Sequence, residues 1–252
     1  MRFPHRAVIS IIITITVAPM VAAAAASASS IQATARAVKD CIRVTDTISV
    51  GGFPEEVAAN PKTKTIYVAN DAGNTVSVIS GLTNTVTATI PVGTAPTGIA
   101  ADPKTNTIYV ANFGDNTVSV ISGRTNTVTA TIPVGAEPFG VAANPKTNAI
   151  YVSHLSSSTV SVISGQTNAV VATVPVGTES GGIAANPKTN TIYVANFLDN
   201  TVSVINGRTN TVTATILVGT TPTGIAANPK TNTAYVTNYT DNTVSVLAPC
   251  RR

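Results

Sequence analysis

The stretch T-A-Y-V-T-N, residues 233–238, is the last of five near-copies of one strand-like segment. The earlier copies centre on Tyr67, Tyr109, Tyr151 and Tyr193, and each tyrosine follows the one before by 42 residues without insertion or deletion. A period of this length is typical of solenoids, propellers and domain arrays. The secondary structure predicted within one repeat decides among these three architectures.

One repeat, residues 98–139, contains four short segments that suit β-strands: 98–102, 107–112, 117–122 and 127–132. They are rich in Val, Ile, Thr and Tyr and alternate with period two, while Asn, Pro, Gly and Asp fill the breaks between them. Connections this short join antiparallel neighbours, because a parallel crossover needs about a dozen residues or more. Four antiparallel strands per repeat indicate a propeller blade and disfavour a parallel β-helix.

The two ends of the repeat array complement each other. Residues 43–48, R-V-T-D-T-I, align with the fourth segment T-V-T-A-T-I of the next repeat, whereas the last repeat stops after its third segment, 243–247. A ring closes if the N-terminal strand completes the last blade, and closure removes exposed sheet edges. The prediction is an all-β, five-bladed β-propeller, closed in this way.

These residues resemble the YVTN repeat family of β-propellers, over roughly residues 43–252. The tetrapeptide that gives the family its name stands at 235–238, and Y-V-A-N stands in three other copies. The resemblance implies a propeller fold and an exported or envelope protein. It implies no particular chemistry, because fold-level likeness alone does not carry an activity.

The N-terminus has the features of a secretory signal peptide. Arg2 and Arg6 precede an apolar run over 7–18, and A-S-A at 26–28 offers a small-residue cleavage site. We expect a signal peptide over 1–28, a linker over 29–42 and the propeller over 43–252. The alternative is an uncleaved anchor, since residues 7–26 are just long enough to span a bilayer.

The chain has two cysteines, Cys41 and Cys250. In repeat register they occupy the positions of Thr83 and Leu82, so a closed ring would place them side by side on one turn. A disulfide is the expected state in an exported protein. Two thiols without a nearby histidine do not make a zinc site, so we expect no metal and no cofactor.

Comparison of the repeats separates constant turns from variable loops. The turns after the first and third strands are nearly constant, as N-P-K-T-N and S-G-x-T-N. The loops after the second strand and those leading into the first strand vary, and we call their end of the molecule the variable rim. Loops on a rigid scaffold commonly carry binding sites.

The predicted charge is segregated between the two rims. The variable rim carries carboxylates, whereas the constant turns carry a ring of lysines, Lys62, Lys104, Lys146, Lys188 and Lys230. This ring could contact an anionic polymer or lipid surface, although solvated turn lysines are the simpler interpretation. The net charge of +4 would fall close to neutrality without Arg2 and Arg6, which disfavours nucleic acid as the main partner.

Acidic and aromatic side chains interleave on the variable rim, as on many carbohydrate-binding or cation-binding surfaces. Asp115, Asp199 and Asp241 precede Asn-Thr and are expected to cap turns. The ligand-binding candidates are Glu55, Glu56, Phe113, Glu137, Phe139, Glu179, Phe197 and Tyr239. The repeated tyrosines of the second strands are expected to be packing residues.

Catalysis has one weak candidate residue, His154, in the loop that departs most from its siblings. No G-x-S-x-G, histidine pair or phosphate-cradling glycine loop accompanies it, so we expect a surface histidine. The sequence therefore favours a secreted or cell-envelope binding module, expected to be monomeric, that holds a protein, glycan or envelope polymer. A lactonase-like or lyase-like propeller enzyme is the alternative, followed by a nucleic-acid-binding propeller.

Overall fold

The computed structural model describes residues 43–249, and of these residues 45–249 belong to one compact unit. The predicted signal peptide, the linker and both cysteines of the predicted disulfide lie outside the described residues. Within 43–249 the chain is all β, with nineteen strands and no helix, and therefore no helix that could cross a membrane.

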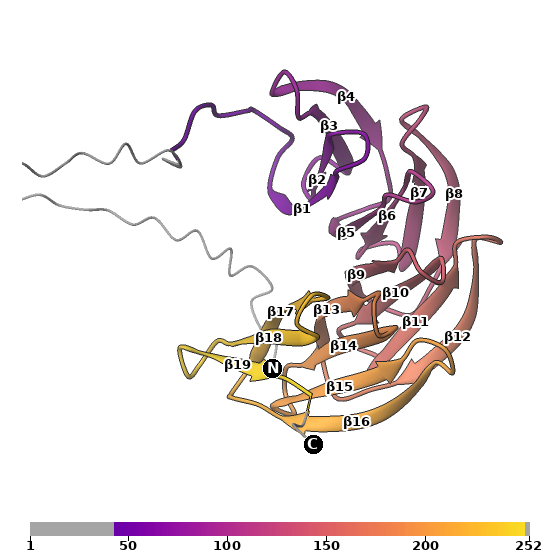
Figure 1. The fold of residues 1–252 in the computed structure, drawn as a ribbon. Coiled ribbons are helices and arrows are strands. Elements are labelled where there is room, and N and C mark those ends of the chain that lie inside the picture. Colours follow the sequence, from indigo (N-terminus) through magenta and orange to yellow (C-terminus); the bar gives the residue numbers. More distant parts are fainter. Residues whose placement is uncertain (1–42, 250–252) are drawn as a thin grey trace, which may run out of the picture. The chain divides into compact units, whose positions relative to one another are not determined.

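The strands form five antiparallel sheets, one per repeat (Figure 1). The first two sheets contain β1 (Pro54–Asn60), β2 (Thr65–Asn70), β3 (Thr75–Ser80) and β4 (Thr85–Pro91), then β5 (Pro96–Asp102), β6 (Thr107–Asn112), β7 (Thr117–Ser122) and β8 (Thr127–Pro133). The third and fourth contain β9 (Pro138–Asn144), β10 (Ala149–His154), β11 (Thr159–Ser164) and β12 (Ala169–Pro175), then β13 (Ser180–Asn186), β14 (Thr191–Asn196), β15 (Thr201–Asn206) and β16 (Thr211–Leu217). The fifth contains β17 (Pro222–Asn228), β18 (Thr233–Asn238) and β19 (Thr243–Leu247).

The strands predicted for residues 98–132 match β5 to β8 to within two residues, because alternating β-branched residues and turn-forming breaks specify them locally. Every residue that directly precedes a second, third or fourth strand has a positive φ, and most of these residues are asparagines, such as Asn106, Asn116 and Asn126. Asparagine tolerates this left-handed conformation better than other side chains with a Cβ. The asparagine that recurs directly before these strands is therefore favoured by the backbone conformation.

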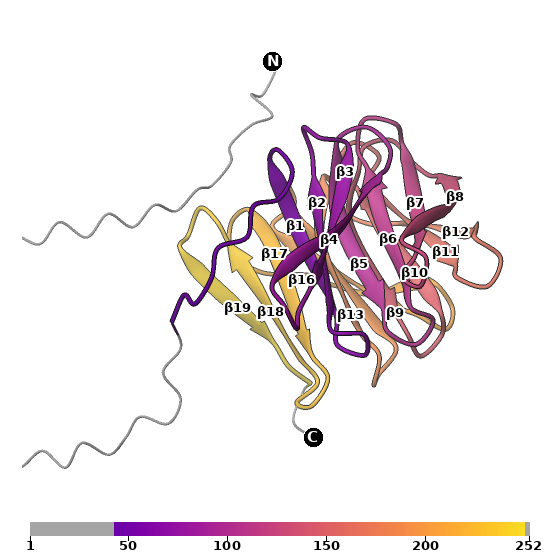
Figure 2. The same ribbon diagram turned by 90° about the horizontal axis from the view of Figure 1, so that it is seen from above.

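The hydrophobic core lies between successive sheets. The first strands pack in series, β1 on β5, β5 on β9, β9 on β13 and β13 on β17, on the inner side of the unit (Figures 1 and 2). Between these sheets Tyr67, Tyr109 and Tyr151 are fully buried among valine and isoleucine side chains. The packing role predicted for the tyrosines is confirmed for these three repeats.

The predicted ring closure is not seen in the described residues. Residues 43–50 form no strand, and the last sheet has three strands instead of four. No packing comparable to that of β1 on β5 joins β17 to β1 within 43–249. Tyr235 accordingly keeps 42% of its surface exposed, unlike its three buried counterparts.

Candidate functional site

The loops of the variable rim are held by backbone bonds that recur in each repeat. Phe53, Ala95, Glu137, Glu179 and Thr221 occupy equivalent positions before the first strand of each sheet, and all have φ between 50° and 59°. The N–H of Glu137 donates to Asn116 Oδ1 at 2.9 Å, and its carbonyl accepts from the N–H of Leu155 at 3.1 Å. Left-handed residues other than Gly and Asn are uncommon, and these bonds hold them in place.

The three aspartates that we expected to cap turns accept backbone hydrogen bonds from a neighbouring loop. Asp115 Oδ2 accepts from the N–H of Thr94 at 2.6 Å, and Asp199 and Asp241 make the equivalent bonds. The bond from Thr94 lowers the pKa of the Asp115 carboxyl. These aspartates are structural, as predicted, but they join two loops instead of closing their own turn.

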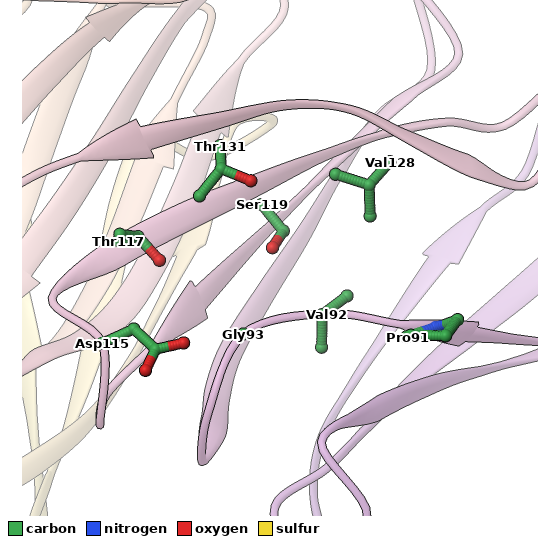
Figure 3. A pocket seen from close by; sticks show the side chains of 8 residues that line it. All are labelled: Pro91, Val92, Gly93, Asp115, Thr117, Ser119, Val128 and Thr131. Atoms are coloured by element: carbon green, nitrogen blue, oxygen red, sulfur yellow. The ribbon is translucent and has the colours of Figure 1, made fainter.

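A hollow of about 470 Å³ lies where the connection after β4 meets the second sheet (Figure 3). Asp115, Thr117, Ser119 and Thr131 supply side-chain oxygen atoms to its lining (Figure 3). Three of these residues already have partners, because Thr117 Oγ1 and Ser119 Oγ both accept from Asn112 Nδ2 at 2.9 Å, and Asp115 Oδ2 accepts from the N–H of Thr94. Most of the polar groups in this hollow are therefore already bonded within the protein.

A second pocket, of roughly 380 Å³, is lined by the first strands of all five sheets, β1, β5, β9, β13 and β17. We call it the inner-strand pocket. Three of the predicted ligand residues meet there: Glu55, Glu56 and Phe139. The other five, Phe113, Glu137, Glu179, Phe197 and Tyr239, lie on the loops of the variable rim and do not line it. No lysine or arginine is among the lining residues.

Glu56 enters this pocket because the first repeat departs from the others. Its position holds glycine in the remaining four repeats. A Cβ on Gly98 or on Gly182 would lie 2.1 Å from a carbonyl oxygen of the next sheet, so a side chain is excluded there. In the first repeat this position carries a side chain, and the Glu56 carboxylate extends toward the second sheet. There its Oε2 accepts a hydrogen bond from the N–H of Ile99 at 2.8 Å.

Both pocket glutamates have a raised pKa. For Glu56 the main cause of the raised pKa is desolvation by the surrounding protein, and the hydrogen bond from Ile99 partly opposes this increase. The residue as a whole is nevertheless exposed to solvent. Desolvation also raises the pKa of Glu55, with a further contribution from the negative charge of Asp71. A carboxylate that is costly to ionise gains from a cationic partner. The pocket is therefore suited to a positively charged group.

His154 is the catalytic candidate, and the expectation of a surface histidine is wrong. It is the last residue of β10 and has no exposed surface. It stands where the other repeats have the asparagine of Y-V-A-N, and its Nε2 lies 2.9 Å from Ser161 Oγ, as Asn112 Nδ2 lies from Ser119 Oγ. The alignment of Y-V-S-H with Y-V-A-N could have shown from the sequence that His154 takes the place of this asparagine at the end of a strand.

Burial also sets the charge state of His154. Desolvation lowers its pKa to about 4, although backbone groups of Ala136 and Gly135 partly oppose the shift. The imidazole is therefore neutral near pH 7. The imidazole has no exposed surface, and its hydrogen bond with Ser161 gives it a structural role.

The opposite rim carries the five predicted lysines, each exposed in the turn that follows a first strand. Their backbone N–H groups are held by the preceding polar residue, as in the bond from Lys104 N to Asp102 Oδ1 at 2.8 Å. Lys146 Nζ donates to the carbonyl of Lys188 at 3.3 Å. The lysines thus lie on one rim because the turn that carries them recurs at the same end of every sheet.

Comparison with known proteins shows the fold alone. No protein-family model and no curated protein sequence matches this chain. A functionally unknown protein from Desulfotomaculum acetoxidans has a similar structure, with a TM-score of 0.69, 17% identity, and 79% of this chain and 70% of that chain covered. Hydrazine synthase from Kuenenia stuttgartiensis aligns at a TM-score of 0.49 with 14% identity, over 83% of this chain and 99% of that chain. The likeness to the Desulfotomaculum protein, together with the repeated antiparallel sheets, shows a β-propeller-like fold.

Proposed function

We propose that this chain belongs to the YVTN repeat family and forms a closed five-bladed propeller. The 42-residue period, the Y-V-T-N and Y-V-A-N strands and the five successive sheets support this assignment. The repeat phase supports closure, since residues 43–48 match the fourth strand that the last sheet lacks. The predicted leader supports an exported protein, which acts as a monomer at the cell envelope or beyond it.

The proposed function is that of a binding module that holds a positively charged ligand group in the inner-strand pocket. The observation that carries this proposal is that Glu55, Glu56 and Phe139 line one pocket whose lining residues include no lysine or arginine. A carboxylate pair binds an ammonium or guanidinium group by charge-assisted hydrogen bonds, and an aromatic face adds a cation–π contribution. Such a group can belong to a protein, an amine-bearing glycan or an envelope polymer.

The lysine ring on the opposite rim is a second proposed contact, toward an anionic surface. Its five exposed ammonium groups face the same end of the unit, and no comparable cationic cluster lies on the variable rim of the described residues. A module with two oppositely charged ends could rest on an anionic envelope polymer while its acidic pocket stays open. Nucleic acid remains a disfavoured partner for an exported protein of nearly balanced charge.

Titration of the purified protein with N-acetyl-lysine amide and N-acetyl-arginine amide tests the pocket, and N-acetyl-norleucine amide serves as the neutral control. We expect binding of at least one cationic probe and none of the neutral one. Glu55→Gln/Glu56→Gln should weaken it at least tenfold, whereas Glu137→Gln, outside the pocket, should leave it unchanged. Equal weakening by both variants, or equal binding of norleucine, would contradict the proposal.

The pH dependence of probe binding is a second test of the proposed pocket. Protonation of Glu55 and Glu56 removes the negative charge that the probe needs. Because the pKa values of both are raised above 4.5, affinity should begin to fall at a higher pH than for an ordinary surface glutamate. Affinity that stays constant from pH 7 down to pH 4 would show that these carboxylates do not hold the probe.

A further inference from the structure

A groove of about 660 Å³ lies between the second and third sheets, at the end of the unit that carries the predicted lysines. The second sheet contributes the turns that follow β5 and β7 and part of its outermost strand β8 (Figure 1), and the third sheet contributes the turn that follows β11. The volume falls within the range of roughly 300 to 1,000 Å³ that is usual for small-molecule sites. Because Glu55, Glu56 and Phe139 do not line this groove, it is separate from the inner-strand pocket.

The hydroxyl of Tyr109 makes no hydrogen bond within residues 43–249. Tyr109 is 1% exposed and lines the groove, and a Cβ on Gly165 of the facing wall would lie 2.9 Å from its Oη. In the next interface the equivalent hydroxyl of Tyr151 donates to Asn210 Oδ1 at 3.1 Å. The counterpart of that acceptor is Asn168, which also lines the groove. A buried hydroxyl without a partner favours a ligand that supplies one.

A substitution in the second sheet removes a further bond from this interface. Elsewhere an asparagine at the end of a first strand donates to the next sheet, as Asn60 Nδ2 donates to Asn106 Oδ1 at 2.8 Å. Asp102 stands at this position in the second sheet and has no N–H to donate, and Asn148 Oδ1, the expected acceptor, is buried without a partner. Asp102 itself does not line the groove, and its Oδ1 accepts from the N–H of Lys104. The second and third sheets are therefore joined by fewer side-chain bonds at this end than the third and fourth.

Arg124 supplies the positive charge of the groove. Its side chain is exposed and has no ion pair or hydrogen bond among the described residues. The equivalent turn positions hold Leu82, Gln166 and Arg208, so the turn itself does not require an arginine. No aspartate or glutamate is among the described residues that line the groove. A guanidinium with free N–H groups holds a carboxylate or another oxyanion by paired, charge-assisted hydrogen bonds.

The rest of the lining is mostly neutral and polar, with five threonines and two asparagines. Some of these groups are already bonded, since Thr129 Oγ1 donates to Val120 O at 3.2 Å. The side chains of Thr105, Thr107 and Asn168 make no hydrogen bond within residues 43–249. They offer hydroxyl and amide groups beside small methyl groups, and a sugar ring presents a similar mixture of hydroxyls and C–H groups. The lining therefore suits a sugar better than an acidic peptide, which would need more than one cation.

We propose that this groove binds an anionic sugar, with Arg124 on its carboxylate or sulfate group and with Tyr109 and Asn168 on its ring hydroxyls. The site goes beyond the proposed function, because it uses no residue of the inner-strand pocket and does not require closure of the ring. Desolvation, with a contribution from the charge of Asp102, raises the pKa of Tyr109 to about 12. The hydroxyl therefore stays protonated near neutral pH and can donate to the sugar.

Calorimetric titration of the purified protein with trigalacturonic acid tests the proposal, and its fully methyl-esterified form is the neutral control. A sulfated galactose trisaccharide forms a second arm, which distinguishes a carboxylate from a sulfate as the anionic group. We expect saturable binding of at least one charged sugar and at least tenfold weaker binding of the methyl ester. Equal binding of the ester, no binding of either charged sugar, or equal binding of a hexa-aspartate peptide would overturn the proposal.

Two matched arginine variants test the charge. Arg124→Gln should weaken binding of the charged sugar at least tenfold, because it removes a charge-assisted bond. Glutamine stands at the equivalent position in the third sheet, as Gln166, so the turn accepts it. Arg208→Gln makes the same change two sheets away and should leave the affinity unchanged. Equal weakening by both variants would show general attraction to a basic end and would overturn the site.

Two matched tyrosine variants separate binding from stability. Tyr109→Phe removes a hydroxyl without a partner in the described residues, so it should weaken binding roughly three- to tenfold and leave the denaturation midpoint unchanged. Tyr151→Phe removes a hydroxyl that is bonded to Asn210, so it should lower the midpoint and leave binding unchanged. Unchanged affinity in Tyr109→Phe would show that the hydroxyl does not contact the sugar.

Amide chemical shifts in the unmodified protein locate the sugar independently of any variant. Titration with trigalacturonic acid should shift the amide signals of Gly165 and Asn168 and leave that of Glu56 unchanged. Shifts centred on Lys188, away from the groove, would contradict the proposal. The inner-strand pocket is tested separately, because Arg124→Gln should bind N-acetyl-lysine amide as tightly as the parent does. Failure of one site can therefore be told from failure of the other.

Discussion

Strands β6 and β18 carry nearly the same sequence, T-I-Y-V-A-N and T-A-Y-V-T-N, and sit in very different surroundings. Tyr109 of β6 is 1% exposed because the third sheet covers it, whereas Tyr235 of β18 is 42% exposed and no following sheet covers it within residues 43–249. The difference shows that burial in this fold comes from the neighbouring repeat. A repeat of this kind cannot complete its own core, so the ends of the array need either each other or another partner.

The largest expected effect comes from truncating the two tyrosines in parallel. Tyr109→Ala should lower the free energy of unfolding by about 3 to 5 kcal/mol, the usual cost of removing a buried aromatic ring. If the last sheet packs on the first, Tyr235→Ala should cost a similar amount. Chemical denaturation of both variants measures this, and a cost below about 1 kcal/mol for Tyr235→Ala would show an open face.

A smaller effect is expected from restoring the repeat consensus at His154. The pKa of this buried histidine is lowered from 6.5 to about 4, so the unfolded chain binds a proton at higher pH than the folded one. This contribution to stability is therefore complete above pH 6.5 and is lost as the pH falls through 4, with a limiting loss of roughly 3 to 4 kcal/mol.

His154→Asn should remove this loss, because asparagine makes the bonds that Asn112 makes to Thr117 and Ser119 and does not titrate. The measurement is the unfolding free energy of both proteins at pH 7 and at pH 4.5. The variant should match the parent at pH 7 and exceed it at pH 4.5. A variant that is destabilised at both values would mean that the imidazole has a role that the asparagines of other repeats do not share.

The smallest effect concerns the left-handed residues of the variable rim. Glu137 has a φ of 52°, a conformation that asparagine adopts at lower cost. Glu137→Asn should raise the unfolding free energy by about 0.5 kcal/mol, and Glu137→Ala, which keeps the cost of a Cβ, should change it little. Glu179→Asn provides a replicate in the next repeat. Destabilisation by both asparagine variants would show that the glutamates make contacts beyond their backbone bonds.

Sequence reasoning predicted much of this fold because its information is local and repeated. The alternation of Thr107 to Asn112, the turn asparagines and the small residues of the first strands each indicate an element without knowledge of the rest. The burial of Tyr67, Tyr109 and Tyr151 followed from the same pattern. The sequence predicted a strand within residues 43–50, and the structure has none there. Such a strand would have to pair with a segment about 200 residues away in the chain, and a local sequence pattern does not show whether that pairing forms.

The candidate site was only partly predictable. The sequence indicated Glu55, Glu56 and Phe139 among eight candidate rim residues. Which of the eight line one pocket depends on how the first strands of all five sheets pack against one another, and the sequence does not show this packing. The substitution of Glu56 for a glycine that recurs in every other repeat was the available signal. His154 was misplaced because its loop looked irregular, while its alignment with Asn112 and Asn196 placed it at the end of a buried strand.

The central functional claim is that a cationic group binds in the inner-strand pocket, and amide chemical shifts measured during titration with N-acetyl-lysine amide test it most directly. The predicted result is a saturable set of shifts at Glu56, Ile99 and the pocket glycines Gly98, Gly140 and Gly182. These shifts should be absent in Glu55→Gln/Glu56→Gln. Shifts confined to loop residues such as Glu137, Glu179 and Tyr239, or no shifts at all, would contradict the claim.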